Sequence, residues 1–408
     1  MSRGNNIKNL CIIKEREALL ELKQGLVDDE YKLLSSWRNE ENNEECFSWR
    51  GLECSNTTGC LPHILVLNLH IGTTESNTDG PDKNLILTGN ITSSLVKLQY
   101  LKYLDLSSNN FLGSHRLLEF LSFEGNALTG SLINLTTFSS LKELRLRENS
   151  LNGIFHESFR QISCLEYLDL SNNQMTGSLP DLAFFPSLRE LHLQSNHFYG
   201  MIPQGLGKLS ELKTLDVSFN RLQGFLDNLG KLSKMKILDV YFNRLKGLPE
   251  ILGQLFDLGT FDAPNNLLEC TISESHFSNL CNLRSSKFSS NSLTWNASVD
   301  WVPCFQLQVI SLSYCNLGRT TQNDTMPSWF TKLPPMLYFL NLSYNHINGE
   351  MQDLSANNIG SIVIDLGYNN FSGPLPTFPH LISELRVDNN KFSGSLNSIC
   401  KIRSSVTT

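Results

Sequence analysis

Residues 165–177 read LEYLDLSNNQMTG and follow the pattern LxxLxLxxNxLxG, with Met175 in the last apolar position. The pattern recurs along the chain, and its ninth residue is an Asn in every copy but one, which has a Cys. Successive ninth positions are 17 to 30 residues apart, most of them 23 or 24, as expected of a repeat that contributes one structural unit per copy. These positions are Asn109, Asn126, Asn149, Asn173, Asn196, Asn220, Asn243, Asn266, Asn291, Cys315, Asn345, Asn369 and Asn390.

The spacing predicts how each copy folds. The LxL segment is expected to form a short strand, and strands of successive copies should stack in parallel about 5 Å apart, with leucines inward. The chain must turn sharply after the strand, and an Asn side chain can satisfy both the donors and the acceptors left in that bend. The sequence therefore predicts an internal Asn ladder, in which Cys315 forfeits hydrogen bonds worth about 1 kcal/mol each.

Composition excludes several classes of function. The chain has 408 residues, 40% of them hydrophobic, and a net charge of −7 without a basic run, so nucleic acid is not an expected partner. The longest apolar run, residues 64–69, has the length of a strand and is too short to span a membrane. The first fifteen residues contain too few apolar side chains for a signal peptide.

Turns that follow the ninth position point to a family. Gly177 with Pro180, Gly200 with Pro203 and Gly373 with Pro376 form LxGxIP-like segments. They resemble the plant-type leucine-rich repeats of receptor kinases, receptor-like proteins and polygalacturonase inhibitors. The resemblance implies an α/β leucine-rich-repeat solenoid, curved, with a concave parallel β-sheet and an N-terminal helical cap.

The N-terminal segment resembles the cap of that family. Residues 15–26 place Ala18, Leu19, Leu22 and Leu26 on one helical face, and Trp37 and the stretch CFSWRGLEC at residues 46–54 follow. The expected organisation is a disordered N-terminus at 1–10, a cap at 11–70, about 13 repeats at 71–400 and a disordered tail at 401–408.

Two further stretches narrow the resemblance. ISESHFSNL, at residues 272–280, and residues 291–318 are similar to receptor-like proteins of the fungal-xylanase receptor group. That resemblance implies a plasma-membrane receptor with an extracellular ligand-recognition ectodomain, one membrane helix and no kinase, which acts in plant defence or development signalling. It implies a protein, peptide or glycan ligand, with coreceptor and adaptor receptor kinases as partners. Since the family continues beyond the position of Thr408, we expect a truncated ectodomain. A secreted inhibitor of a microbial wall-degrading enzyme and a non-functional receptor relic remain as alternatives.

The ten cysteines fall into two groups. Family caps carry adjacent cysteines, whereas here Phe47 follows Cys46, so the cap resemblance implies that Cys11 pairs with Cys46 and that Cys54 pairs with the additional Cys60. Among the rest, Cys164 and Cys315 are expected to be small buried side chains. Cys270, Cys281 and Cys304 are expected outside the strands, where Cys270 with Cys281 is one conceivable pair. Cys400 is expected to have its partner beyond this sequence, and no spacing indicates a metal site.

Glycosylation and ligand binding are expected on different parts of the surface. Outward positions of the strands would present aromatic and charged side chains on a rigid sheet, as interface hot spots do. The expected ligand-binding residues are Arg145, Arg147, His192, Asp216, Phe219, Asp239, Tyr241 and Phe242, although each Asp is also an ordinary feature of LDLS-type strands, and the aromatics could instead pack between copies. The sequons are at Asn56, Asn90, Asn134, Asn296, Asn323, Asn341 and Asn370. Between Glu143 and Asn265 none of them falls on an outward strand position, whereas Asn341 occupies one.

Catalysis is not expected. Asp216, Asp239 and Asp262 would lie about 5 Å apart, as the carboxylates of a retaining glycosidase do, but an open sheet offers no desolvated cleft to separate their pKa values. GxSxG, HExxH and P-loop motifs are absent from the sequence. We therefore expect neither an enzyme nor a cofactor.

Overall fold

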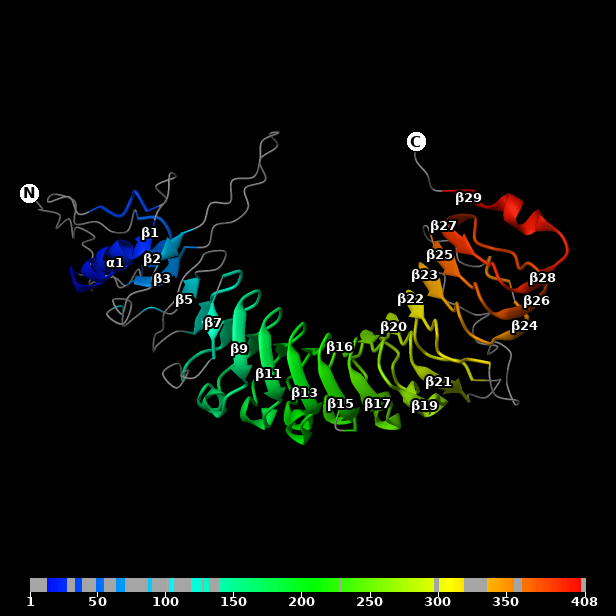
Figure 1. Cartoon of the computed structure of the whole chain (residues 1–408), viewed down its shortest axis with the longest axis horizontal. Helices are drawn as coiled ribbons and strands as arrows, with labels where there is room; N and C mark the ends of the chain where they lie inside the picture. Colours follow the sequence, from blue (N-terminus) through cyan, green and yellow to red (C-terminus); the bar gives the residue numbers. More distant parts are fainter. Residues whose placement is uncertain are drawn as a thin grey trace, which may run out of the picture. The chain divides into compact units, whose positions relative to one another are not determined.

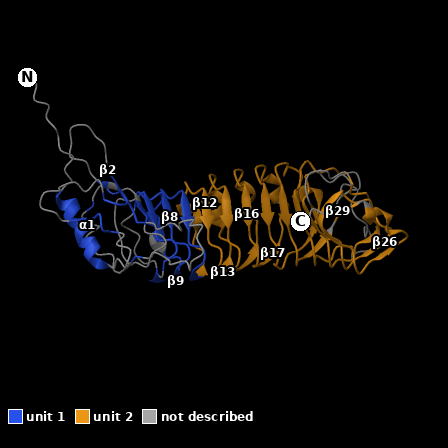
Figure 2. Cartoon of the chain, turned by 90° about the horizontal axis from the view of Figure 1, so that it is seen from above, with its two compact units in different colours: residues 1–176 blue, residues 177–408 orange. Residues whose placement is uncertain are grey.

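The structure, a computed structural model, describes most of the repeat region and parts of the N-terminal segment. The described residues are 13–27, 34–38, 49–54, 64–69, 87–89, 98, 101, 103–105, 119–126, 128–131, 139–227, 229–296, 301–318, 336–351, 353–355 and 362–404. The chain divides into two compact units, Met1–Thr176 and Gly177–Thr408, which are coloured separately in Figure 2.

Unit 1 begins with the predicted N-terminal helix, α1 (Ile13–Gly25), whose Ala18, Leu19 and Leu22 are buried. Trp37 and Trp49 are also buried and stack with ring centroids 5.7 Å apart. The N-terminal helix and the two tryptophans expected from the sequence are thus confirmed as part of a packed core.

The strands of unit 1 form a main sheet and shorter pairings beside it. Its main-sheet strands run parallel from β3 onward, and β2 pairs with β3 antiparallel. They are β2 (Leu52–Cys54), β3 (Ile64–Asn68), β5 (Tyr103–Asp105), β6 (Phe120–Ser122), β8 (Glu143–Arg145) and β10 (Tyr167–Asp169). The remaining elements are β1 (Leu26–Val27), β4 (Thr88–Gly89), β7 (Thr129–Gly130), β9 (Ser150–Ile154), η2 (Glu157–Gln161) and β11 (Gln174–Ser178).

Unit 2 continues with one parallel main-sheet strand per copy, which confirms the predicted solenoid. In Figure 1 this sheet lines the inner side of the unit's curve. Its strands are β12 (Glu190–His192), β14 (Thr214–Asp216), β16 (Ile237–Asp239), β18 (Thr260–Asp262), β20 (Ser285–Lys287), β22 (Val309–Ser311), β23 (Phe339–Asn341), β25 (Ile362–Asp365), β27 (Leu381–Arg386) and β29 (Arg403–Ser404). The last of these lies inside the segment expected to be disordered and pairs with β27.

The outer side of unit 2 carries further strands and 3-10 helices, which the repeat pattern did not predict. The strands are β13 (His197–Met201), β15 (Arg221–Phe225), β17 (Arg244–Gly247), β19 (Glu269–Ile272), β21 (Ser292–Trp295), β24 (Asn348–Glu350), β26 (Asn370–Pro374) and β28 (Lys391–Ser393). The helices are η3 (Leu182–Phe184), η4 (Gln204–Lys208), η5 (Leu229–Lys231), η6 (Glu250–Gln254), η7 (Glu274–His276) and η9 (Leu396–Lys401).

The Asn ladder forms as the spacing predicts. Asn220 Nδ2 donates to the carbonyls of Leu193, Val217 and Ser218 at 2.9 to 3.2 Å, and its Oδ1 accepts from Phe198 N at 2.9 Å. The residue before it, Phe219, has a φ of 51°, in the left-handed region, because the chain bends there. Asn243, Asn266, Asn291, Asn345, Asn369 and Asn390 repeat this arrangement.

The predicted loss of hydrogen bonds at Cys315 is wrong, because other groups replace them. The Cys315 thiol donates to Phe288 O at 3.2 Å and lies 3.4 Å from Ser313 O. Leu293 N, whose counterparts donate to an Asn side chain, donates to Cys315 O at 3.0 Å instead. The thiol is a weaker donor than an amide. With these bonds, however, the backbone groups that an Asn side chain would otherwise bind still have hydrogen-bond partners.

Several cysteine predictions need correction. Cys281 is bonded to Cys304, with their Cα atoms 4.8 Å apart, so the pair of Cys270 with Cys281 is wrong. Cys270 is free and lies within β19 rather than outside the strands. Cys164 is exposed, not buried, whereas Cys315 is buried as expected. Cys400 is free and exposed.

The cap cysteines and most sequons are not open to comparison. Cys11, Cys46 and Cys60 lie outside the described residues, as does the side chain of Cys54. Of the sequons, Asn296, Asn341 and Asn370 are described, while Asn56, Asn90, Asn134 and Asn323 are not.

Candidate ligand-binding face

On the main sheet of unit 2, polar side chains at the same outward position of successive strands form a row. Side chains alternate across a strand, and in β14 Leu215 is buried while Thr214 and Asp216 are half-buried. Strand register places His192, Asp216, Asp239 and Asp262 beside one another in a single row. The outward positions expected from the sequence are therefore on one face.

An aromatic cluster lies next to this row, where β14 and β16 end. Phe219 packs edge-on against Tyr241, with centroids 4.7 Å apart, and stacks on Phe242 at 5.5 Å. Phe219 and Phe242 nevertheless remain 44% and 53% exposed. The rings therefore pack between copies, which is one of the two alternatives considered from the sequence, and they also remain exposed on the sheet face.

The aspartates of the row bond to their own strand ends. Asp216 Oδ1 accepts from the backbone N and the hydroxyl of Ser218, at 3.0 and 2.7 Å. Asp239 Oδ1 accepts from Tyr241 N at 2.9 Å. Asp365 does the same with Gly367 N at 3.0 Å. These bonds fit the expectation that the Asp residues belong to the scaffold, but each occupies only one of the two carboxylate oxygens.

The charges along the row are unevenly compensated. Asp262 pairs with Lys287 at 2.7 Å. No described residue forms an ion pair with Asp216 or Asp239, although Lys287 acts on Asp239 at longer range. The pKa of Asp239 is raised to about 6, chiefly by burial. The carboxylates of Asp216 and Asp262 also raise it, while the Tyr241 N–H hydrogen bond and Lys287 oppose the shift. Negative charge is thus concentrated beside the aromatic cluster.

Two grooves flank the aromatic cluster on unit 2. One, of about 560 Å³, runs past Phe219 and Phe242 and is also lined by Arg221 and Arg244. The other, of about 450 Å³, lies between Tyr241 and Tyr314 and is lined by acidic residues, Lys287 and serines. Both volumes fall in the range of small-molecule and side-chain binding sites.

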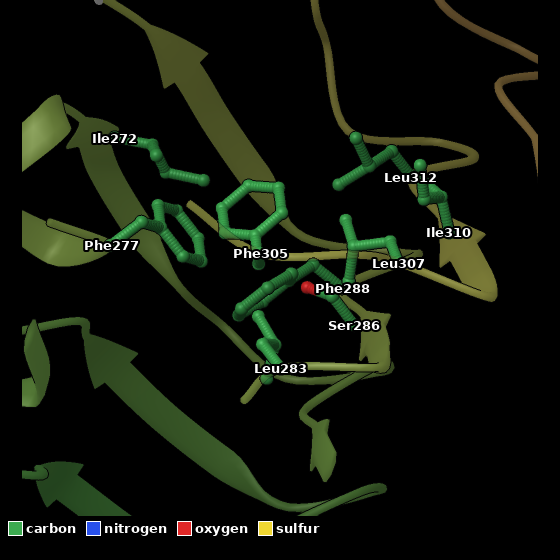
Figure 3. Close-up of a pocket in the computed structure, with 9 residues that line it drawn as sticks. All are labelled: Ile272, Phe277, Leu283, Ser286, Phe288, Phe305, Leu307, Ile310 and Leu312. Carbon is green, nitrogen blue, oxygen red and sulfur yellow. The ribbon is translucent and has the colours of Figure 1, made fainter. Parts of the chain in front are cut away.

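A third cavity is too small to be a site. It has a volume of about 20 Å³ and is lined by Phe277, Phe288, Phe305 and neighbouring apolar side chains, which point toward one another in Figure 3. This is room for about one water molecule, and the lining is apolar except for Ser286. The cavity belongs to the core beside the Cys281–Cys304 disulfide.

A second aromatic group was not predicted from the sequence. Tyr314, Tyr344 and Tyr368 stack face to face, with centroids 4.1 and 4.2 Å apart and rings within 10° of parallel. All three are between 40% and 53% exposed. They occupy the position just before the ladder residue, as Phe219 and Phe242 do, so the recurrence of aromatics at that position was the available signal.

The remaining predicted residues each have an acidic neighbour. In unit 1, Arg145 pairs with Glu143, and its guanidinium lies 4.8 Å from the centre of the Tyr167 ring. Arg147 pairs with Glu148 at 2.6 Å, also in unit 1. In unit 2, His192 Nε2 lies 3.5 Å from Glu190 Oε2. The other predicted ligand-binding residues also lie in unit 2, where the structure brings Asp216, Phe219, Asp239, Tyr241 and Phe242 together.

Comparisons with known proteins agree with this architecture. Residues 110–356 match the family described as leucine-rich repeat region, and residues 12–55 match the leucine rich repeat N-terminal domain. The chain is 51% identical to receptor-like protein EIX2 of Solanum lycopersicum over 343 residues, which are 77% of this chain and 31% of that protein. It is 53% identical to receptor-like protein EIX1 of the same species over 286 residues, 65% of this chain and 26% of that protein. The chain thus spans less than a third of the length of these relatives.

Solved structures show the same fold. A TDR receptor superposes with a TM-score of 0.63 at 24% identity, over 75% of this chain and 58% of that one. The ectodomain of the receptor kinase GASSHO1/SCHENGEN3 from Arabidopsis thaliana, in complex with CASPARIAN STRIP INTEGRITY FACTOR 2, superposes with a TM-score of 0.59 at 26% identity. That match covers 75% of this chain and 44% of the receptor.

Proposed function

Because this chain belongs to the leucine-rich-repeat receptor-like proteins of plants, we propose that it is a ligand-recognition part of a receptor ectodomain on the extracellular face of the plasma membrane. It acts in defence or development signalling, recruits coreceptor and adaptor receptor kinases and has no catalysis of its own. Leucine-rich-repeat ectodomains are typically non-catalytic. Within the described part of the chain, no helix has the length and apolar character needed to cross a bilayer.

The observation that carries the proposal is the exposed cluster of Phe219, Tyr241 and Phe242. Large aromatic side chains that stay half in water on a sheet face are the usual anchors of protein interfaces. Ladder hydrogen bonds hold the backbone on both sides of the cluster, so little conformational entropy is lost when a partner binds. Burial of each exposed ring would contribute on the order of 2 kcal/mol.

The surroundings of the cluster support the same assignment. The carboxylates of Asp216 and Asp239, with which no described residue forms an ion pair, lie beside the rings and give the surface charge specificity. The nearest described sequon on the main sheet, Asn341, lies in β23, several strands further along. Glycans at the described sequons would therefore leave β14 and β16 open to a partner.

The proposal is tested with a double variant, Tyr241→Ala and Phe242→Ala, in the secreted glycoprotein. A fungal xylanase, the ligand suggested by the family resemblance, is the first probe, and affinity is measured by surface plasmon resonance. We expect binding to weaken by at least about 2 kcal/mol, roughly 30-fold. Circular dichroism should show an unchanged fold.

A matched control comes from the outer side of unit 2. Tyr199 in β13 and Phe225 in β15 are 54% and 51% exposed but lie away from the main sheet. The variant Tyr199→Ala with Phe225→Ala should bind as the wild type does. Equal affinity of the wild type and the Tyr241/Phe242 variant, or equal losses in both double variants, would reject the main-sheet site.

A further inference from the structure

We propose that the groove between Tyr241 and Tyr314 receives a cationic side chain, arginine or lysine, of a peptide or protein ligand. This inference rests on the proposed function, since it names the chemistry that the same receptor face recognises. Three features of unit 2 carry it: the shape of the groove, the open face of Tyr314 and the uncompensated charge of Asp239.

The groove exists because small side chains separate two aromatic groups. Ser289, Ser290, Ser311 and Ser313 line it between Tyr241 and Tyr314, and the recess has a volume of about 450 Å³. Ser290 fills far less space than Phe219, Phe242 or Tyr314, which occupy the corresponding position of other copies. An extended side chain can enter this recess from the open side of the sheet.

Tyr314 offers one ring face to this recess. Its other face stacks on Tyr344 at 4.1 Å, and Tyr344 in turn stacks on Tyr368 at 4.2 Å. The position in the preceding copy that corresponds to Tyr314 is Ser290, which is too small to cover the free face. The ring is 53% exposed, and the electron-rich face of an aromatic ring attracts a guanidinium or ammonium group.

The charges of the groove favour a cation over an anion or a neutral group. Its lining contains two carboxylates, Asp239 and Asp262, and one ammonium group, Lys287. Lys287 forms its ion pair with Asp262 at 2.7 Å, so the ionised lining keeps a net negative charge, and Asp216 in the next strand adds another carboxylate. Burial is the largest cause of the raised pKa of Asp239, about 6, and Lys287 offsets the shift only in part. An incoming cation would supply the missing partner.

A neutral glycan is the alternative occupant. It could stack on Tyr314 and bond to the serine hydroxyls, but it would leave the charge of Asp239 uncompensated. Binding of a cationic side chain should therefore depend on the charge of Asp239, whereas binding of a neutral glycan should not. The experiment tests this difference.

The test uses a phage-displayed library of random dodecapeptides, selected on the immobilised glycoprotein at pH 7. We expect peptides from the wild type to be enriched in arginine and lysine, and this enrichment to be lost on Asp239→Asn and on Tyr314→Ala. Asp365→Asn is the matched control, because Asp365 lies in the same row and makes the same bond to its strand end, but outside the groove. It should select the same basic peptides as the wild type.

Synthetic peptides then measure the charge dependence directly. Replacing the selected arginine by citrulline, which is nearly isosteric and neutral, should weaken binding to the wild type at least tenfold. The same replacement should have little effect on binding to Asp239→Asn. Circular dichroism on each variant shows whether a lost preference for basic peptides is due to unfolding.

Each other outcome has a defined meaning. Selection without basic enrichment, no selected peptide at all, or equal binding of the arginine and citrulline peptides would overturn the cationic site. Displacement of the peptide by neutral xylohexaose, with equal affinity for the wild type and Asp239→Asn, would make the groove a glycan site. In all these cases the Tyr241/Phe242 variant still tests the receptor face separately, so failure of this inference is distinguishable from failure of the proposed function.

Discussion

Asn345 Oδ1 accepts a hydrogen bond from the backbone N–H of Cys315 at 3.0 Å, and a second from Leu317 N at 3.1 Å. Its Nδ2 donates to three carbonyls, those of Leu312, Leu342 and Ser343. The backbone of the one copy without a ladder Asn is therefore hydrogen-bonded by the Asn of the following copy. This relationship helps to explain how the array tolerates Cys315. We also expect Asn345 to contribute more to stability than the other ladder Asn residues do.

Asn345→Ala should destabilise unit 2 by about 3 kcal/mol or more, because it leaves several buried backbone groups without partners. Cys315→Ala removes only a weak thiol donor and should cost about 1 kcal/mol. Urea unfolding followed by tryptophan fluorescence measures both. Cys164→Ala, a change at an exposed cysteine, is the control and should have no effect; a larger loss for Cys315→Ala than for Asn345→Ala would contradict the assignment.

The disulfide of Cys281 with Cys304 closes a loop whose ends are 23 residues apart. Replacing both by serine should cost about 3 kcal/mol, since the unfolded chain regains the entropy of that loop. Cys270→Ser, a change at a free cysteine in the same region, is the control. Equal unfolding midpoints for the double variant and the wild type would show that the bond contributes nothing to stability.

Non-reducing peptide mapping of secreted protein checks the pairing itself. It should join Cys281 to Cys304 and leave Cys270 alkylated. The same map tests the pairs expected in the cap, Cys11 with Cys46 and Cys54 with Cys60. An alkylated Cys54 or Cys60 would exclude the second cap pair.

Asp239 should make stability depend on pH in an unusual direction for a carboxylate. Its pKa is about 6, above the ordinary 3.8, so between these values the folded chain binds more protons at this site than the unfolded chain. Its contribution to stability therefore falls as the pH rises from about 4 to 6, by at most about 3 kcal/mol. Lys287, which faces the same groove, reduces this effect, while Asp216 and Asp262 increase it.

The measurement is the difference in unfolding free energy between Asp239→Asn and the wild type. The variant should be the more stable protein above pH 6, and the difference should vanish near pH 4. Asp365→Asn serves as the control, with no such pH-dependent gain. A variant that is less stable than the wild type at pH 7.5 would show that the ionised carboxylate is stabilising after all.

Hydrogen exchange should reveal a weak C-terminal copy. Leu385, Val387 and Phe392 are only half-buried, whereas their counterparts Ile364, Leu366 and Phe371 in the preceding copy are fully buried. Stability in repeat arrays is approximately a sum over copies and their interfaces. Amides after Glu384 should therefore exchange fast and those between Leu141 and Phe261 slowly. Protection through Val387 equal to that of the middle copies would contradict this expectation.

The amino-acid sequence alone was sufficient for the repeat architecture. The inward leucines, the parallel strands and the ladder depend on residues within one copy and its neighbour, so a pattern such as LEYLDLSNNQMTG specifies them locally. For the same reason, the period of the repeat was enough to place the outward row of Asp216 and Asp239, and the aromatics beside it, on one face.

Other features depend on how copies pack, and only the tertiary structure decided them. Cys281 bonds to Cys304 rather than Cys270 because the segment between them brings their Cα atoms within 4.8 Å. Cys315 is tolerated because Leu293 N reaches the Cys315 carbonyl. Lys287 forms an ion pair with Asp262 and not with Asp239 because its ammonium group lies within ion-pair distance of only one of the two carboxylates. These contacts depend on the distances between groups in different copies, and such distances cannot be derived from the periodicity of a sequence.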